Sequence, residues 1–271
     1  MKKTFLITTT AILIAFTVKA QEVEYRNAPP EEIPMRRFDP NRLRFGVFVA
    51  PTLSWMHPTA SKSDDGNYYV NNKGSKTGFI WGLISEYRFA SNYSTVFGFD
   101  INATGGKIDA TLNPSQLSPA TPSTVLTADY DYKLQYIEIP LALKLHSDPL
   151  GKSRLKIFGQ LGLTLAVNIS RKATYDVAYN DANGVEKTQS GDNEKLQGSL
   201  AVAPIILQLN VGAGIEYPIA SKLSLYSGIF FNNGFLPSAI NPKNYEMGYD
   251  GNFSDGNVRL NNIALRIGMF F

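Results

Sequence analysis

Apolar and polar residues alternate with a period of two over most of the chain after residue 42. A period of two is typical of β-strands, whereas an amphipathic helix would repeat about every 3.6 residues. Each alternating segment is at least as long as the roughly 9–11 residues with which a tilted strand crosses a bilayer. The eight predicted strands are Leu43–Trp55, Thr77–Phe89, Ser94–Thr104, Lys133–Leu145, Leu155–Ile169, Ala203–Tyr217, Leu223–Phe231 and Val258–Phe271.

The two faces of these strands suit a membrane better than water. One face of the first strand carries Phe45, Val47 and Leu53, and no charged residue lies on the corresponding face of any other strand. A Lys or Arg that faced lipid at mid-bilayer would cost about 2–4 kcal/mol, so we expect the apolar faces to contact lipid. A soluble lipocalin-like barrel is the alternative, and it would place the apolar face inside. The opposite faces carry Arg44, Glu86, Arg88, Asp100, Glu138, Lys144, Lys156, Glu216 and Arg266.

The connections between the predicted strands alternate in length. The segments 90–93, 147–154 and 218–222 are short, whereas 57–76, 105–132, 171–202 and 232–257 are long and rich in Asn, Asp, Gly and Ser. Outer-membrane barrels have short turns on the periplasmic side and longer loops outside the cell. The sequence therefore predicts an all-β fold, an eight-stranded antiparallel transmembrane β-barrel of the outer membrane with short periplasmic turns and long extracellular loops.

The N-terminal region differs from the rest of the chain. Lys2 and Lys3 precede an apolar stretch from Phe5 to Val18, and Ala20 provides a small residue for a signal peptidase. We therefore expect residues 1–20 to be a signal peptide removed after Ala20, with an uncleaved anchor as the alternative. Residues 21–41 contain four prolines among charged residues and read as a Pro-rich periplasmic leader. Residues 42–271 form the predicted barrel domain.

Composition supports this assignment and limits the possible partners. Only 18% of residues are charged, 12% are aromatic, and the net charge of +3 is scattered, which does not favour nucleic-acid binding. The expected partners are outer-membrane lipid and lipopolysaccharide, with secretion or envelope proteins as further candidates. The absence of Cys excludes lipid attachment at an N-terminal Cys, disulfides and thiolate chemistry.

An eight-stranded barrel has an interior just wide enough for side chains. Charged groups in so narrow a space must be paired and hydrogen-bonded. We therefore predict a structural salt-bridge cluster inside the barrel, with a proton or ion path as the alternative. The predicted members of the cluster are Glu86, Arg88, Asp100, Glu138, Lys144, Lys156, Glu216 and Arg266.

Three prolines, Pro51, Pro140 and Pro204, lie within predicted strands. A proline cannot donate a hydrogen bond to the ladder, and a closed barrel has no edge strand to hold it. We expect a bulge or a loss of ladder hydrogen bonds at each of these positions.

Candidate catalytic and metal-binding residues are few. His57 falls in a predicted extracellular loop and His146 at a predicted periplasmic turn, and neither has a catalytic partner that spacing identifies. Segments 64–67, 181–184 and 250–257 are rich in oxygen ligands for Ca²⁺, but Asp, Asn and Gly are also the usual turn residues. We therefore expect no enzyme, no catalytic residues, no cofactor and no metal site.

Three motifs resemble those of the PorT-like outer-membrane barrels. They are RFGV at Arg44–Val47, YIEIPLALKL at Tyr136–Leu145 and GAGIEY at Gly212–Tyr217. The resemblance implies an eight-stranded barrel in a Gram-negative bacterium and a link to type IX protein secretion. Our hypothesis is a non-enzymatic scaffold or interaction component of the cell envelope. The alternatives are a small ion or solute channel and a surface adhesin or binding protein that works through its long loops.

Overall fold

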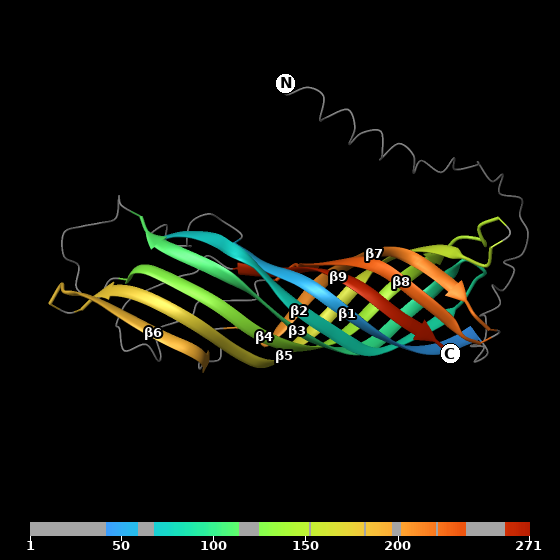
Figure 1. The fold of residues 1–271 in the computed structure, drawn as a ribbon, viewed down its shortest axis with the longest axis horizontal. Helices are drawn as coiled ribbons and strands as arrows, with labels where there is room; N and C mark the ends of the chain where they lie inside the picture. Colours follow the sequence, from blue (N-terminus) through green and yellow to red (C-terminus); the bar gives the residue numbers. More distant parts are fainter. Residues whose placement is uncertain are drawn as a thin grey trace, which may run out of the picture. The chain divides into compact units, whose positions relative to one another are not determined.

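The computed structural model describes residues 42–58, 68–113, 125–151, 153–181, 183–196, 202–220, 222–236 and 258–271. The predicted signal peptide and leader lie outside these residues, as do the oxygen-rich segments 64–67 and 250–257. The fold of the described residues is all-β (Figure 1). No helix among them has the length and apolarity that a membrane crossing requires.

Eight strands close into a barrel in which every strand is antiparallel to both of its neighbours. The order around the ring is β1–β2–β3–β4–β5–β7–β8–β9, and β9 pairs with β1 to complete it. This arrangement confirms the predicted eight-stranded barrel. The strands of the ring are β1 (Leu43–Pro58), β2 (Tyr68–Arg88), β3 (Tyr93–Leu112), β4 (Val125–His146), β5 (Lys156–Asn180), β7 (Ile205–Pro218), β8 (Ser224–Gly234) and β9 (Val258–Phe270).

The outer face of the barrel carries a continuous belt of exposed apolar side chains. Leu83, Leu141 and Ile229 are 60–63% exposed, far more than apolar residues of a soluble core. Aromatic rings lie at both ends of the belt, where Trp55 stacks on Phe231 and Phe89 stacks on Tyr93. Aromatic girdles at the two interfaces are typical of outer-membrane barrels. The belt confirms the predicted lipid-facing side of the strands. A lipocalin-like barrel would have its apolar side chains inside, and the belt has them outside.

The short connections join strands at one end of the barrel, as predicted. They are residues 89–92, 147–155 and 219–223, and each is closed by main-chain hydrogen bonds such as Ile219 N to Leu223 O at 2.9 Å. The start of β1 and the C-terminal residue lie at the same end, and Phe271 N donates to Phe45 O there. This is the periplasmic end of the barrel.

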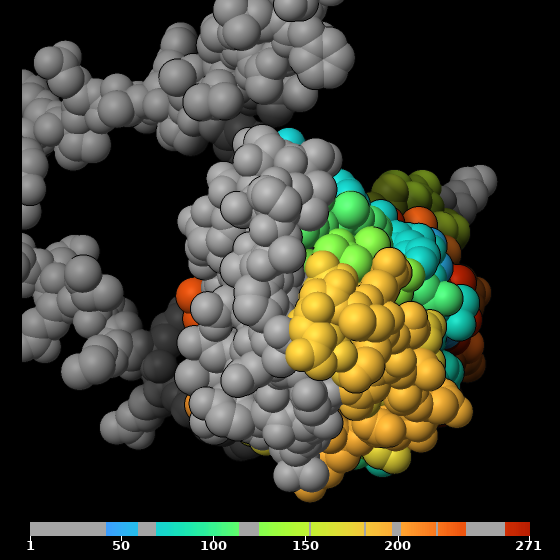
Figure 2. All heavy atoms as spheres, turned by 90° about the vertical axis from the view of Figure 1, so that its left-hand side faces the viewer, coloured from blue at the N-terminus to red at the C-terminus, as the bar shows by residue number. Residues whose placement is uncertain are grey.

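The predicted long loops are wrong in a large part of their length, because β2–β5 continue well beyond the belt (Figure 1). These four strands form an extension of the barrel on the extracellular side. A further strand, β6 (Glu186–Lys195), lies in what was predicted to be loop 171–202 and pairs with the last residues of β5. In the space-filling view onto this end, the golden surface of β6 lies in front (Figure 2). His57, also predicted in a loop, lies in β1 opposite Arg259.

The extension has the opposite arrangement of faces from the membrane-spanning part. In β4 the outward side chains change from Asp131 and Lys133 in the extension to Ile137 and Leu141 in the belt. The inward side chains change in the reverse sense, from the buried Tyr130 and Tyr132 to Glu138 and Lys144. The extension is therefore built like a water-soluble sheet, with an apolar interior and a polar outside. The change between Gln135 and Ile137 marks the outer boundary of the membrane-spanning part of β4.

Two of the three prolines interrupt the ladder without shifting its register. The pairing of β1 with β9 omits Ala50 and Pro51, and the pairing of β3 with β4 omits Ile139 and Pro140. The expected loss of ladder pairs is confirmed at Pro51 and Pro140, but the alternative of a bulge is wrong at both. Pro204 lies just before β7, where its carbonyl accepts a hydrogen bond from the Asn168 amide, so it needs no strand irregularity.

Candidate functional site

The periplasmic half of the lumen contains a compact group of charged side chains. Lys144 Nζ lies 3.0 Å from Glu86 Oε2 and 3.2 Å from Glu216 Oε2, so one ammonium bridges two buried carboxylates. The guanidinium of Arg44 bonds the same two acids, at 2.8 Å to Glu86 Oε2 and 2.8 Å to Glu216 Oε2. Two cations and two anions thus neutralise one another; Glu86, Lys144 and Glu216 are buried and Arg44 is partly buried, and buried charges require such pairing.

Strand register brings these residues together. Arg44 lies directly opposite Glu86 in the pairing of β1 with β2. Lys144 and Glu216 come from β4 and β7, which lie on either side of β5 in the ring, and their side chains meet in the lumen. Arg44 reaches Glu216 from β1, three strands away in the ring, and the narrow interior of an eight-stranded barrel allows this contact.

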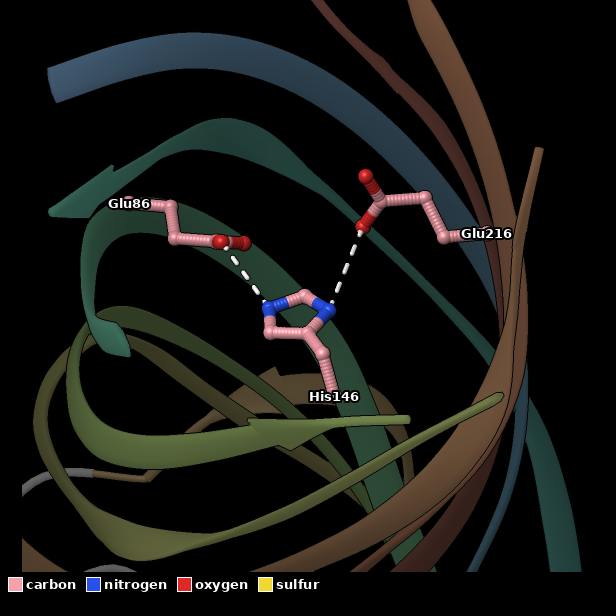
Figure 3. Close-up of side chains that lie close together, drawn as sticks. All are labelled: Glu86, His146 and Glu216. Atoms are coloured by element: carbon pink, nitrogen blue, oxygen red, sulfur yellow. Dashed lines mark hydrogen bonds and ion pairs between the residues drawn. The ribbon is translucent and has the colours of Figure 1, made fainter. Parts of the chain in front are cut away.

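His146 completes the charged group. The sequence-based placement of this residue at a periplasmic turn is corrected by the structure. It is the last residue of β4, is buried inside the lumen, and lies between the carboxylates of Glu86 and Glu216 (Figure 3). Its Nε2 is 3.0 Å from Glu86 Oε1, and its Nδ1 is 4.0 Å from Glu216 Oε2. His146 therefore has ion-pair partners in the lumen that spacing along the sequence does not identify.

Ser94 Oγ lies 3.0 Å from Nε2 of His146, which raises the question of a catalytic serine. In a catalytic triad the serine and the acid contact opposite nitrogens of the imidazole. Here Ser94 and Glu86 share Nε2, and Glu216 is too far from Nδ1 for a hydrogen bond. Ser94 is also fully buried, so a substrate has no access to its hydroxyl. The arrangement orders the imidazole but lacks the geometry of a catalytic triad, because no acid bonds the opposite nitrogen.

Glu86, His146 and Glu216 also place three potential metal ligands within 4.8 Å of one another. The charges around them argue against a cation at this position. Lys144 already occupies the space between the two carboxylates, and Arg88 adds another positive charge 3.8 Å from Glu86. A divalent ion would enter a group whose acids are already neutralised, and the cation of this site is the Lys144 ammonium.

A layer of aromatic rings fills the lumen next to the charged group. Phe158 packs against Tyr226 and Phe230, with ring centroids 6.3 Å and 6.2 Å away, and Tyr226 packs against Phe270 at 5.1 Å. Lys144 Nζ lies 4.3 Å from the centroid of Phe158, and a second cation, Arg266, lies 4.5 Å from that of Phe230. These distances are typical of cation–π contacts, so the rings stabilise both buried cations.

Deeper in the membrane-spanning part is a second polar group. Asp100 and Glu138 lie directly opposite each other in the pairing of β3 with β4, and both are buried. Asn102 donates to Glu138 at 2.7 Å. On the neighbouring strands a chain of amides links Gln160, Asn210, Asn232 and Asn262 by hydrogen bonds of 2.6–2.9 Å.

The eight predicted cluster residues therefore divide into two groups rather than one. Glu86, Lys144 and Glu216 come together near the periplasmic end, with Arg88 at their margin. Asp100 and Glu138 form the second group, Arg266 contacts the aromatic layer, and Lys156 joins neither group. Sequence reasoning placed Arg44 on the inward face but left it out of the cluster, and it missed His146. The period of two that makes Glu138 and Lys144 inward also makes His146 inward, so that signal was present in the sequence.

Comparison with known proteins agrees with this architecture. Residues 20–229 match the family model described as outer membrane protein beta-barrel domain. The chain belongs to this family. It is therefore an outer-membrane β-barrel protein, and the predicted location is confirmed.

Solved structures that are similar to this outer-membrane barrel protein have low sequence identity to it and low TM-scores. Neisserial surface protein A is 15% identical, with a TM-score of 0.35 over 83% of this chain and 95% of that one. Ail, the attachment invasion locus protein of Yersinia pestis, is 12% identical, with a TM-score of 0.33 over 84% of this chain and 97% of that one. OprG from Pseudomonas aeruginosa is 12% identical, with a TM-score of 0.35 over 84% and 92%. No curated protein matches the sequence, and no functional role follows from these similarities.

Proposed function

We propose that this outer-membrane barrel is a closed, non-enzymatic scaffold that acts as an interaction component of the cell envelope through its extracellular extension. The observation that carries the proposal is the filled lumen. The charged group around Lys144, the aromatic layer and the amide chain occupy successive levels of a barrel that is only eight strands wide. Such an interior supports a structural role for the predicted salt-bridge residues and leaves little room for a solute path.

Planar-bilayer recording tests whether the barrel is closed. We expect the reconstituted protein to show no stable conductance steps, with an open porin reconstituted in the same way as the positive control. A reproducible ohmic conductance would overturn the closed barrel and favour the channel alternative. Buried, mutually paired charges are costly to separate, so the group around Lys144 should not open spontaneously.

A fluorophosphonate probe, which labels activated serines, tests the non-enzymatic part of the proposal. We expect no labelling of the folded protein, because Ser94 is fully buried and shares Nε2 of His146 with an acid. Labelling that disappears in Ser94→Ala would show an activated serine and would contradict the proposal.

The extension supports the interaction role because it carries a rigid, charged surface beyond the membrane. Lys73 pairs with Asp129 at 2.7 Å, and Lys107 pairs with Asp131 at 3.6 Å on its outward face. Among the residues that the structure describes, β6 pairs only with β5, and its many charged side chains limit unspecific pairing along the other edge. This geometry suits specific contact with another protein.

Site-specific photo-crosslinking tests where such a partner binds. A crosslinker at the exposed Thr188 of β6 should yield a defined adduct with a protein of the same envelope, whereas one at Lys222 in a periplasmic turn should not yield that adduct. A secretion-machine protein in the adduct would support the PorT-like link to type IX secretion, which we propose on the motif resemblance. An adduct that forms only with molecules added from outside the cell would favour a surface binding protein instead.

A further inference from the structure

The periplasmic end of the lumen contains a cavity of about 620 Å³. We call it the vestibule. Its floor is the charged group described above, because Arg44 and Glu216 belong to both. Its walls come from the ends of β2 and β5 and from the turn between β7 and β8. The vestibule is lined by five cationic side chains, Arg42, Arg44, Arg88, Lys156 and Lys222, and by one acidic side chain, Glu216.

The acid of the vestibule does not neutralise these cations. Glu216 already bonds Arg44 and Lys144. Arg88 reaches an acid only at 3.8 Å, and neither Lys156 nor Lys222 forms an ion pair with any residue that the structure describes. Three cations from three separate elements thus face one cavity without a full counter-charge. Like charges so arranged repel one another and attract an anion.

The rest of the lining narrows the chemistry of that anion. Leu43, Leu223 and Phe271 give the vestibule an apolar side next to its cations. Its volume lies in the range of small-molecule sites and is much larger than a bare phosphate needs. A guanidinium matches the geometry of phosphate oxygens, and lysines supply point charges at the same group. The ligand should therefore combine a phosphate with a less polar remainder.

We propose that the vestibule is a binding site for a phosphate-bearing molecule that enters from the periplasmic side. Two sources share this chemistry, namely a phosphorylated solute of the periplasm and the headgroup of a phospholipid in the inner leaflet. Arg44 and Lys144 remain tied to the carboxylates of the floor, and Arg88, Lys156 and Lys222 contact the phosphate. The site is separate from the extension through which the barrel contacts its partners.

Isothermal titration in a maltoside detergent, which has no phosphate, tests the site on the full barrel. The two probes are glycerol 3-phosphate and a short-chain phosphatidylglycerol. We expect saturable one-to-one binding that weakens with added salt, and a loss of affinity of about tenfold in the double variant Lys156→Gln/Lys222→Gln. The matched control is Lys172→Gln/Lys195→Gln, which removes the same charge from the extension and should bind like the parent protein.

The outcomes separate the two sources and can overturn the site. Binding of glycerol 3-phosphate assigns a soluble ligand, whereas binding of the lipid alone assigns the leaflet. Binding of neither probe, or an equal loss of affinity in both double variants, would overturn the proposal. Lys156 and Lys222 have no ion-pair partner among the described residues, so their double variant should fold like the control variant. The heat-modifiable gel mobility of a folded barrel, measured for both double variants, checks that a loss of affinity is not a loss of folding.

Discussion

At the scale of single residues, Lys144 is the side chain on which the charged group of the lumen depends. We expect Lys144→Met to lower the free energy of unfolding by about 3–5 kcal/mol, because it leaves Glu86 and Glu216 buried with less compensation. Urea titration in lipid vesicles measures this change. Lys172→Met, at an exposed position of the extension, should change stability by less than about 0.5 kcal/mol. If Glu86→Gln does not recover part of the loss in the double variant, the two side chains are not coupled as the structure shows.

Two glycines offer a matched pair that tests how tightly the lumen is packed. A Cβ at Gly212 would lie 2.2 Å from Cδ1 of Phe230, whereas a Cβ at Gly159 would meet nothing within 4 Å. We therefore expect Gly212→Ala to destabilise the barrel by about 1–3 kcal/mol through overpacking, while Gly159→Ala leaves stability nearly unchanged. The same urea titration compares them. Equal effects would mean that the aromatic layer is loose.

The residue scale also shows what the sequence could not reveal. Alternation identified Glu86, Lys144 and Glu216 as inward-facing because direction depends only on a period of two. Which of them meet depends on the register of strands far apart in the chain, such as β4 and β7, and no local pattern encodes that. The predicted strand ends at Leu145, which leaves His146 at the turn, although its position continues the inward row of β4.

At the scale of elements, the sequence predicted the membrane-spanning part of each strand well and the extension poorly. The sequence pattern of the membrane-spanning strands is apolar side chains facing outward. In the extension the apolar side chains face inward instead. Asp129 and Asp131 made the outer half of β4 look like a loop, although they only face water. β6 has no apolar alternation at all, because nearly all of its side chains are exposed. Only its pairing with β5 makes it a strand.

The turn between β5 and β6 should respond to pH. Asp181 accepts hydrogen bonds from the Lys187 ammonium at 2.8 Å and from the amides of Val185 and Asn183. The ammonium and these amides hold the pKa of the Asp181 carboxyl below its ordinary value. A lowered pKa in the folded state means that the stabilisation is complete above the unfolded value, about 3.9, and is lost as the pH falls through the lower folded value.

Amide hydrogen exchange measures this response. Protection of Val185 should fall as the pH drops below about 4, while protection of Leu163 in the membrane-spanning part of β5 should not change. Asp181→Asn should remove the pH dependence, since an amide does not titrate in this range. Protection that falls equally at both amides would indicate a general loss of the barrel rather than the local effect.

At the scale of the whole molecule, the same strands form two parts with opposite arrangements of polar and apolar faces. The membrane-spanning part is apolar outside and polar inside, which suits lipid, and the extension is apolar inside and polar outside, which suits water. The change occurs within single strands, between Gln135 and Ile137 in β4 and near Ile169 in β5. The position of the membrane is therefore encoded in the side chains, independently of loop lengths.

This orientation leads to a prediction that the absence of cysteine makes simple to test. Lys187→Cys places a thiol on the exposed hairpin of the extension, and Lys222→Cys places one in a short turn at the other end. On intact cells a membrane-impermeant maleimide should label the first variant and not the second, and both should react after the outer membrane is opened. Both positions are exposed, so the end of the barrel at which each thiol lies should decide the labelling. The reverse pattern would invert the barrel and place the vestibule at the cell surface.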